Sequence, residues 1–266
     1  MITHSDTLGE EYKNHIVFEQ LTKYSEFYNS LSFSIMSFVT SGTHSLINID
    51  TYTYSSIHNT LNSINDILLK GKINDSYSLL RLYYDSSIIN IYSNLYLKDH
   101  FSLDNFTVEK IDNWVKGKEQ LPTYRVMSNY IRKSDKLSPI NELLYQDDCY
   151  KTLRNRCNDH THYNYYCNFL LNDSKLYLKN RVKTLDLFSK DLKNIFILHL
   201  SYIFYLNNHY LMSSDYMDSL DCGVEPEEGS QYFVAPFIQE IFDTVIKPSR
   251  KDLFVEIKKN TEMKLE

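Results

Sequence analysis

Apolar side chains recur at helical spacing along most of this chain, and no stretch alternates strictly between apolar and polar residues. Six glycines and five prolines among 266 residues are too few to punctuate many short strands and tight hairpins. A hydrophobic fraction of 42%, with 23 tyrosines and 14 phenylalanines, is enough for a substantial aromatic core. We therefore predict an all-α helical bundle that forms one domain over residues 1–266.

Start and stop signals divide this pattern into separate helices. We expect helices over about 8–41, 52–70, 76–98, 104–116, 123–134, 184–211, 232–246 and 249–263. Ser138 followed by Pro139 marks the start of another helix, which should persist through residue 164. The segment 214–230 holds six acids and no base, and its glycines and proline predict an exposed loop.

The charge of the chain is unevenly distributed. A net charge of −6 argues against a protein that coats nucleic acid by charge alone. However, residues 110–136 carry seven bases against three acids, and residues 175–193 carry six against two. These segments are either surfaces for an anionic partner or solvated, lysine-rich helix faces, and the sequence leaves both interpretations open.

Targeting signals and cysteine usage bear on the compartment. The first residues lack a basic region followed by an apolar one, so no secretory signal is predicted. The most apolar run, residues 195–206, is shorter than the roughly 20 residues that span a bilayer, and we expect a buried core helix there. Four cysteines without a signal peptide predict free thiols in a reducing cytoplasm, with no membrane association.

The stretch "YKTLRNRCNDHTHYNYYCNF", residues 150–169, concentrates the polar side chains with chemical potential. On a helix through residue 164, an apolar stripe forms from Leu143, Tyr150, Leu153 and Cys157, and His160 and Asn164 continue it. The same geometry places Arg154 and Arg156 on the shoulders of the stripe and directs Asp159 and His162 away from it. A polar group on a packing face needs a partner or a purpose.

Three interpretations of this stretch remain open. In the structural one, His160 and Asn164 hydrogen-bond to neighbouring helices while Arg154 pairs with an acid such as Asp85. In the metal interpretation, zinc-type ligands come from Cys157, His160, His162 and Cys167, although their spacing matches no common structural zinc pattern. In the third, histidine and arginine act on a phosphodiester.

The phosphodiester interpretation needs few groups. Histidine gives or takes a proton near neutral pH, and arginine holds a phosphate and offsets the charge that develops on its oxygens. RNA supplies its own nucleophile, the 2′-hydroxyl, so the site needs no metal, cofactor or nucleophilic side chain. Gly-rich phosphate loops, G-x-S-x-G elbows, C-x-x-C pairs and H-E-x-x-H helices are absent from the sequence, which disfavours P-loop, serine-hydrolase and zincin chemistry.

Arg154-Asn155, followed after four more residues by His160, resembles the R-x(4–6)-H motif of HEPN domains. The resemblance implies a four-helix core, here over residues 50–211, with extra N- and C-terminal helices. It also implies a metal-independent endoribonuclease of the kind found in abortive infection, phage defence and toxin–antitoxin systems. His160 would be the acid–base residue, Arg154 the phosphate-binding residue and Asn155 the orienting one.

HEPN domains usually build their site from two copies of the motif, so the resemblance implies a cytoplasmic homodimer that acts on RNA, with an antitoxin or regulatory partner as a further candidate. Arg154 and His160 lie about 120° apart on a helix, and a second copy could close that gap. Arg81 and Asp85 resemble the arginine-and-acid helix of some HEPN-like bundles, or form an ordinary i,i+4 ion pair.

Several residues beside the motif remain alternative or supporting candidates. Arg156 and His162 have the same spacing as Arg154 and His160, and Asp159 and Asn164 lie close to both pairs. The alternative function is a non-catalytic helical interaction or scaffold protein, in which this polar motif supports a dimer or partner interface.

Overall fold

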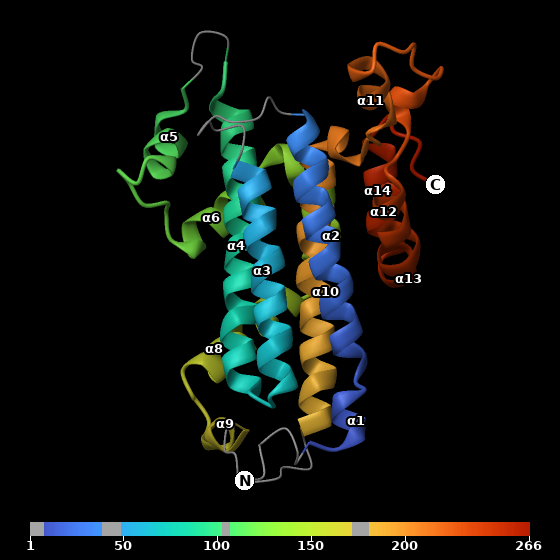
Figure 1. The fold of residues 1–266 in the computed structure, drawn as a ribbon. Helices are drawn as coiled ribbons and strands as arrows, with labels where there is room; N and C mark the ends of the chain where they lie inside the picture. Colours follow the sequence, from blue (N-terminus) through green and yellow to red (C-terminus); the bar gives the residue numbers. More distant parts are fainter. Residues whose placement is uncertain (1–7, 39–48, 103–106, 172–180) are drawn as a thin grey trace. The chain divides into compact units, whose positions relative to one another are not determined.

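The computed structural model describes residues 8–38, 49–102, 107–171 and 181–266, and in these ranges the chain is all-α (Figure 1). An isolated antiparallel bridge joins Met212 to Val234. Gly71, with φ 75°, follows the end of α3 in the left-handed conformation that glycine adopts readily. The predicted fold class is confirmed.

The helices have the following bounds: α1 Glu10–Lys13, α2 Ile16–Phe38, α3 Ile49–Leu69, α4 Ile73–His100, α5 Glu109–Val115, α6 Tyr124–Arg132, α7 Ser138–Leu144, α8 Cys149–Thr161, α9 Tyr166–Leu171, α10 Arg181–Leu206, α11 Asp215–Asp221, α12 Pro236–Ile241, α13 Lys247–Ser249 and α14 Lys251–Lys259. Short 3-10 turns cover Asp135–Leu137, Asn208–Leu211 and Ser230–Tyr232, and a π-helix covers Phe242–Ile246.

The helix expected from Ser138 through residue 164 is interrupted, and that prediction is wrong. The chain leaves α7 at Leu144 and starts α8 only at Cys149. The Asp147 carboxylate accepts a hydrogen bond of 2.9 Å from the Cys149 backbone N–H, a local turn that competes with the continuing helix. The motif therefore lies on a 13-residue helix that begins just before it.

Other boundaries also shift. The predicted helix over 8–41 divides into α1 and α2, and residues 39–48 and 103–106, where two predicted helices end or begin, lie outside the described residues. In the acidic segment 214–230, α11 forms instead of a continuous loop, with Asp215 and Asp218 in its first turn, where carboxylates favour the helix dipole. None of the residues of α11 is buried.

The chain groups into two compact units, each assembled from three segments. Unit 1 comprises Met1–Asn29, Tyr54–Ser86 and Asp147–Phe196, and unit 2 comprises Ser30–Thr53, Ser87–Gln146 and Ile197–Glu266. Residues of α2, α3, α4 and α10 contribute to both. The single domain and its 50–211 core stay predictions.

Aromatic side chains hold the core of unit 1. The Tyr24 ring stacks on Phe196, with centroids 3.9 Å apart and planes within 5°. The hydroxyls of Tyr28 and Tyr83 are hydrogen-bonded at 2.8 Å, which satisfies both polar ends without water. This packing joins α2, α4 and α10, and it confirms the expected aromatic core.

A buried polar network crosses the core of unit 2. The Asp50 carboxylate accepts hydrogen bonds from the amides of Asn90 and Asn94, at 2.6 and 2.7 Å, and from the Tyr210 hydroxyl at 2.7 Å. The imidazole Nε2 of fully buried His199 lies 3.0 Å from Asn90 Oδ1. Burial raises the pKa of Asp50, although its three donors oppose the shift.

Within the described residues, no helix combines the length and apolar character needed to cross a membrane. The run 195–206 forms the end of α10, and its first ten residues are buried, as expected for a core helix: Ile195, Phe196, Ile197, Leu198, His199, Leu200, Ser201, Tyr202, Ile203 and Phe204.

Candidate functional site

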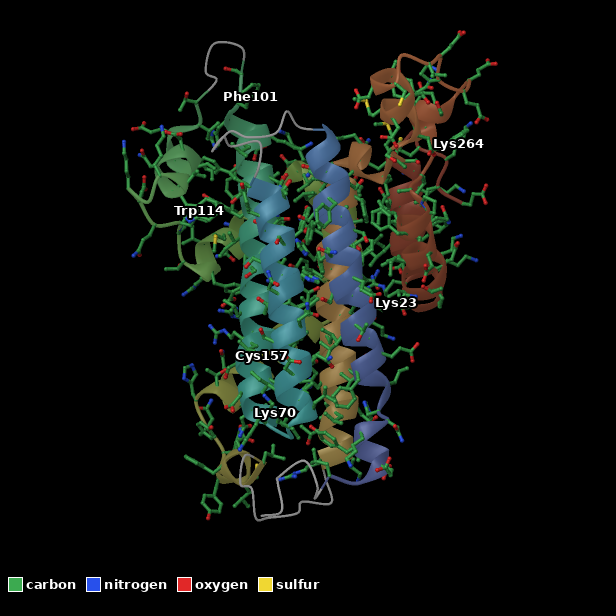
Figure 2. The ribbon with its side chains drawn as sticks, in the orientation of Figure 1. Lys23, Lys70, Phe101, Trp114, Cys157 and Lys264 are labelled. Atoms are coloured by element: carbon green, nitrogen blue, oxygen red, sulfur yellow. The ribbon has the colours of Figure 1, made fainter. Side chains whose placement is uncertain are left out.

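The helix α8 of unit 1 carries the motif and buries one face. Tyr150, Leu153 and Cys157 are 5%, 1% and 1% exposed, and His160 follows them on the same face at 8%. Cys157 is labelled in Figure 2. The predicted stripe is confirmed within α8, but Leu143 belongs to α7 and Asn164 is exposed beyond the helix end.

The His160 ring lies against helix α4. It stacks on Tyr77, with centroids 4.0 Å apart and planes within 4°. Its Nδ1 atom lies 2.6 Å from the Oδ1 atom of Asn74. The ring is therefore held by packing on one face and by a hydrogen bond at one edge.

The hydrogen bonds of Asn74 determine the tautomer of His160. Asn74 Nδ2 donates to the backbone carbonyl of Asn168, which can only accept, so Oδ1 must face the imidazole. An amide oxygen is an acceptor, and Nδ1 of His160 must therefore carry the proton. In the neutral ring the lone pair then lies on Nε2, which has no hydrogen-bond partner among the described residues.

The environment keeps this ring uncharged. Burial lowers the pKa of His160 to about 4, and the positive charge of Arg156 adds to the shift. Asp159 acts in the opposite direction but does not offset burial. At neutral pH the imidazole is therefore a base with a free lone pair rather than a ready proton donor.

The guanidinium of Arg154 pairs with α4. Its Nη1 atom donates to Asp85 Oδ1, and Arg81 Nε donates to Asp85 Oδ2 at 3.4 Å. The side chains of Arg154, Arg81 and Asp85 are 16%, 25% and 30% exposed. Two guanidiniums thus share one carboxylate at a partly buried surface. Asn155, next to Arg154, is exposed.

The alternative pair of Arg156 and His162 is not brought together. Arg156 Nη1 bonds to Asp191 of α10, whose side chain is only 4% exposed. Burial raises the pKa of Asp191, against the effect of its partner Arg156. His162 lies just after α8 and is exposed. Arg156 therefore has a structural partner, whereas His162 faces solvent.

Asp159 and Asn164 close the end of α8. The Asn164 amide donates to the Asp159 carboxylate at 2.7 Å, and Asn168 Nδ2 donates to the Asp159 backbone carbonyl at 2.8 Å. Tyr163 between them has φ 51°, a left-handed conformation that turns the chain into α9. These bonds place Asn168 where its own carbonyl meets Asn74, so the turn after α8 supports the histidine indirectly.

The four residues of the metal interpretation do not form a ligand cluster. Cys157 and His160 are buried, whereas Cys167 and His162 are exposed, and the described residues contain no group of three or more metal-binding side chains. Burial raises the pKa of the Cys157 thiol to about 12, so it stays protonated at neutral pH. All four cysteines of the chain are free thiols.

Asn74 was not predicted as a residue of the site. Asn74, Ser78, Arg81 and Asp85 recur every three or four residues along α4, and each faces a polar residue of the motif region or its neighbour. Ser78 donates to Thr161 of α8 at 3.2 Å. This helical spacing of polar residues is the signal that could have located the second wall of the site.

No protein-family model, no curated protein and no solved structure matches this chain. The fold and the site define an all-α protein in which Arg154 and His160 of α8 bond separately to Asp85 and Asn74 of α4. The family stays a proposal.

Proposed function

We propose that this chain is a metal-independent endoribonuclease of the HEPN type. The observation that carries the proposal is the tautomer of His160, whose Nδ1–H is fixed on Asn74 so that Nε2 holds a free lone pair. That atom takes the proton from a ribose 2′-hydroxyl, whose oxygen then attacks the adjacent phosphorus. The bond to the 5′-oxygen breaks, that oxygen gains a proton, and a 2′,3′-cyclic phosphate remains.

The arginines supply charge for the phosphate. Arg154 and Arg81 share Asp85, and their guanidiniums would hold a phosphodiester by charge-assisted hydrogen bonds and offset the charge that develops on its oxygens. Asn155 is exposed beside them and orients the same group. A bound phosphate also raises the pKa of His160, because a nearby negative charge favours the protonated ring.

A second copy of the chain completes the site in this proposal. Arg154 pairs with Asp85 one to two helical turns from His160, so one copy does not converge both side chains on a single phosphate. In a homodimer, the arginine of one protomer would meet the histidine of its partner. A regulatory partner that covers this surface would restrain the activity until infection or stress.

The test uses total RNA with EDTA, incubated with the purified protein and with the His160→Gln and Arg154→Ala variants. We expect cleavage that leaves 2′,3′-cyclic phosphate ends, and its loss in both variants while circular dichroism shows the fold is kept. Lys251→Glu, an exposed change on α14, is the matched control and should cleave normally. Intact RNA with the unaltered protein would contradict the proposal.

Mixing tests the shared site. If arginine and histidine come from different protomers, the two inactive variants combined should regain part of the cleavage, since a mixed dimer contains one intact pair. Sedimentation should show a dimer in each sample. A monomer that cleaves RNA would contradict the composite site but leave the chemistry standing.

A non-catalytic interaction protein is the second candidate, and the packing of His160 favours it. A ring that is 8% exposed, stacked on Tyr77 and hydrogen-bonded to Asn74 also satisfies the needs of a structural residue. In that case RNA stays intact with every variant, and His160→Gln changes the stability of the dimer instead. The RNA assay and sedimentation together separate the two functions.

A further inference from the structure

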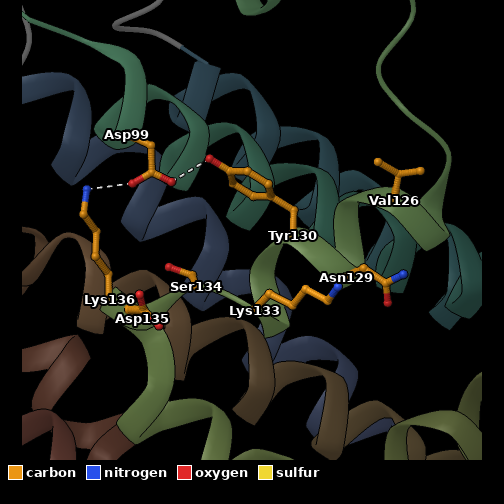
Figure 3. A pocket seen from close by; sticks show the side chains of 8 residues that line it. All are labelled: Asp99, Val126, Asn129, Tyr130, Lys133, Ser134, Asp135 and Lys136. Atoms are coloured by element: carbon orange, nitrogen blue, oxygen red, sulfur yellow. Dashed lines mark hydrogen bonds and ion pairs between the residues drawn. The ribbon is translucent and has the colours of Figure 1, made fainter.

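A pocket of about 540 Å³ opens in unit 2 at helix α6 (Figure 3). It is lined by Asp99, Val126, Asn129, Tyr130, Lys133, Ser134, Asp135 and Lys136. Four of these residues recur at spacings of three, one and three along α6 and its end, so they form one face of the helix. The volume falls within the roughly 300–1,000 Å³ of small-ligand sites.

One wall of the pocket is fixed by an ion pair. The Asp99 carboxylate accepts hydrogen bonds of 2.6 Å from Lys136 Nζ and of 2.6 Å from the Tyr130 hydroxyl, both drawn in Figure 3. Burial alone would raise the pKa of Asp99, but these hydrogen bonds lower it. The carboxylate is thus charged and already satisfied, and the Tyr130 ring is held in place.

The pocket lining also includes charged groups without an ion-pair partner. Lys133, Asp135 and Asn129 are exposed, and no ion pair engages Lys133 or Asp135 among the described residues. Val126, 53% exposed, adds an apolar surface on the same helix face. Two lysines and two aspartates line the pocket, so its net charge is close to zero.

This mixture restricts the ligand. A simple anion would meet Lys133 but would be repelled by Asp135, and an apolar ligand would leave both charges without a partner. The ligand must combine a negative group, hydroxyl donors and a flat apolar surface with polar edges. A nucleotide has all of these in one molecule of suitable size.

We propose that the α6 pocket binds a nucleotide unit, with its phosphate on Lys133, its ribose hydroxyls on Asp135 and its base against Val126 and Tyr130. The Asn129 amide then hydrogen-bonds an edge of the base. The basic surroundings suit a phosphate, because residues 110–136 carry seven bases against three acids. Lys118 and Arg125 are exposed there and could meet the phosphates of a longer chain.

This inference goes beyond the proposed function, since it depends on residues of unit 2 alone and requires no cleavage. The nucleotide could be free or part of a single-stranded RNA, and the two sources share the same chemistry. The experiment therefore has separate arms for the four ribonucleoside monophosphates, for a hexanucleotide RNA and for inorganic phosphate. Calorimetry measures the first and last, and fluorescence anisotropy measures the RNA, with the His160→Gln protein so that no substrate is consumed.

Lys133→Glu is compared with Lys251→Glu, which makes the same charge change at an exposed site of unit 2 outside the pocket. We expect Lys133→Glu to weaken nucleotide or RNA binding at least tenfold, and Lys251→Glu to change it less than twofold. Asp135→Asn should weaken a ribonucleotide more than its 2′-deoxy form. Circular dichroism confirms that the variants are folded.

Binding of only the monophosphates identifies a free nucleotide as ligand, and binding of only the RNA identifies a chain, and either supports the pocket. The inference is overturned if neither binds at millimolar concentration, if inorganic phosphate binds as tightly as the nucleotides, or if the two lysine variants behave alike. These results do not depend on whether RNA is cleaved, so failure of the pocket and failure of the nuclease are distinguishable.

Discussion

His160 of unit 1 and His199 of unit 2 are both buried histidines held by an asparagine of α4, but through opposite ring nitrogens. Asn74 accepts from Nδ1 of His160, whereas Asn90 accepts from Nε2 of His199. In each case the other side of the asparagine amide is fixed by an acceptor, the Asn168 carbonyl or the Asp50 carboxylate. The two rings are therefore opposite tautomers.

The comparison shows that two histidines in similar packing can differ in their access to solvent and in their free hydrogen-bonding atoms. His199 is 0% exposed and bonds to Asn90, which is 1% exposed, so its role is to satisfy polar groups inside the core. His160 keeps 8% exposure, and Nε2 has no partner among the described residues. Burial lowers the pKa of both rings, to about 3 for His199 and about 4 for His160. The difference between the two rings is the free lone pair on Nε2 of His160. A general base needs such a lone pair, whereas a purely structural histidine does not.

Replacing each histidine with glutamine should give the largest difference between the two residues, and that difference should appear in the rate of RNA cleavage. His160→Gln should lower the rate of RNA cleavage by about 10²–10⁴-fold, the usual contribution of a general acid–base group. His199→Gln keeps an amide donor for Asn90 and should leave the rate per folded molecule unchanged. Single-turnover cleavage of a labelled RNA measures both, and equal losses would show that the two histidines do not differ in function.

For stability we expect the opposite order: replacing His199 should lower the free energy of unfolding more than replacing His160. His199→Ala leaves a cavity and an unpaired Asn90, which should cost about 2–5 kcal/mol of unfolding free energy. His160→Ala should cost less, because the exposed edge lets water reach the vacated site. Urea unfolding measures both. A larger cost at His160 would favour a structural role for that ring.

The pH dependence of stability should reveal the lowered pKa of His160. Between its ordinary value of 6.5 and about 4, the unfolded chain binds a proton that the folded chain does not. The stabilising contribution is therefore complete above pH 6.5 and is lost as the pH falls towards 4. His160→Gln should reduce the loss between pH 7 and 4 by roughly 3 kcal/mol.

The loss of stability that depends on His199 should extend further, to about pH 3, because its pKa in the folded chain is about 3. Urea unfolding of His160→Gln and His199→Gln at a series of pH values measures both effects. An unaltered pH dependence in His160→Gln would mean that the ring is not desolvated in the folded protein.

Asn74 should give the smallest effect on catalysis, as a positioning residue. Asn74→Ala frees the tautomer of His160 and should lower kcat about tenfold with little change in KM. Asn74→Asp keeps an acceptor for Nδ1–H and adds a negative charge, so it should restore part of kcat and move the pH profile to higher pH. The matched variant Asn90→Ala should cost stability and spare kcat. If neither substitution at Asn74 alters the pH profile of kcat, Asn74 does not position His160.

Helical periodicity and the scarcity of glycine and proline predicted the fold class correctly, because amphipathic spacing indicates which type of element forms. The stripe that contains His160 was also predictable from its spacing along α8. The break at residues 145–148 was not, since it depends on one side chain of Asp147 that captures a backbone N–H. Local turn chemistry of this kind competes with periodicity over a few residues.

The partners of the motif depended on packing between distant segments. The sequence indicated Asp85 as an acid for Arg154, and the structure confirms that pair. The contact between Asn74 and His160 was not predicted, because the two residues are 86 positions apart in the sequence. The local sequence pattern does not indicate such a contact. The same holds for the α6 pocket, whose lysines were visible as a basic segment but whose cavity was not.

The central claim is that His160 presents a free Nε2 lone pair to RNA. Nitrogen-detected NMR of the protein with ¹⁵N-labelled histidine tests it most directly, with His160→Gln to assign the signal. We predict the Nδ1–H tautomer for this ring at pH 7, with an Nε2 resonance that shifts when a single-stranded oligonucleotide is added, while His199 shows the Nε2–H tautomer and does not respond. An Nε2–H tautomer for His160, unchanged by the oligonucleotide, would contradict the account.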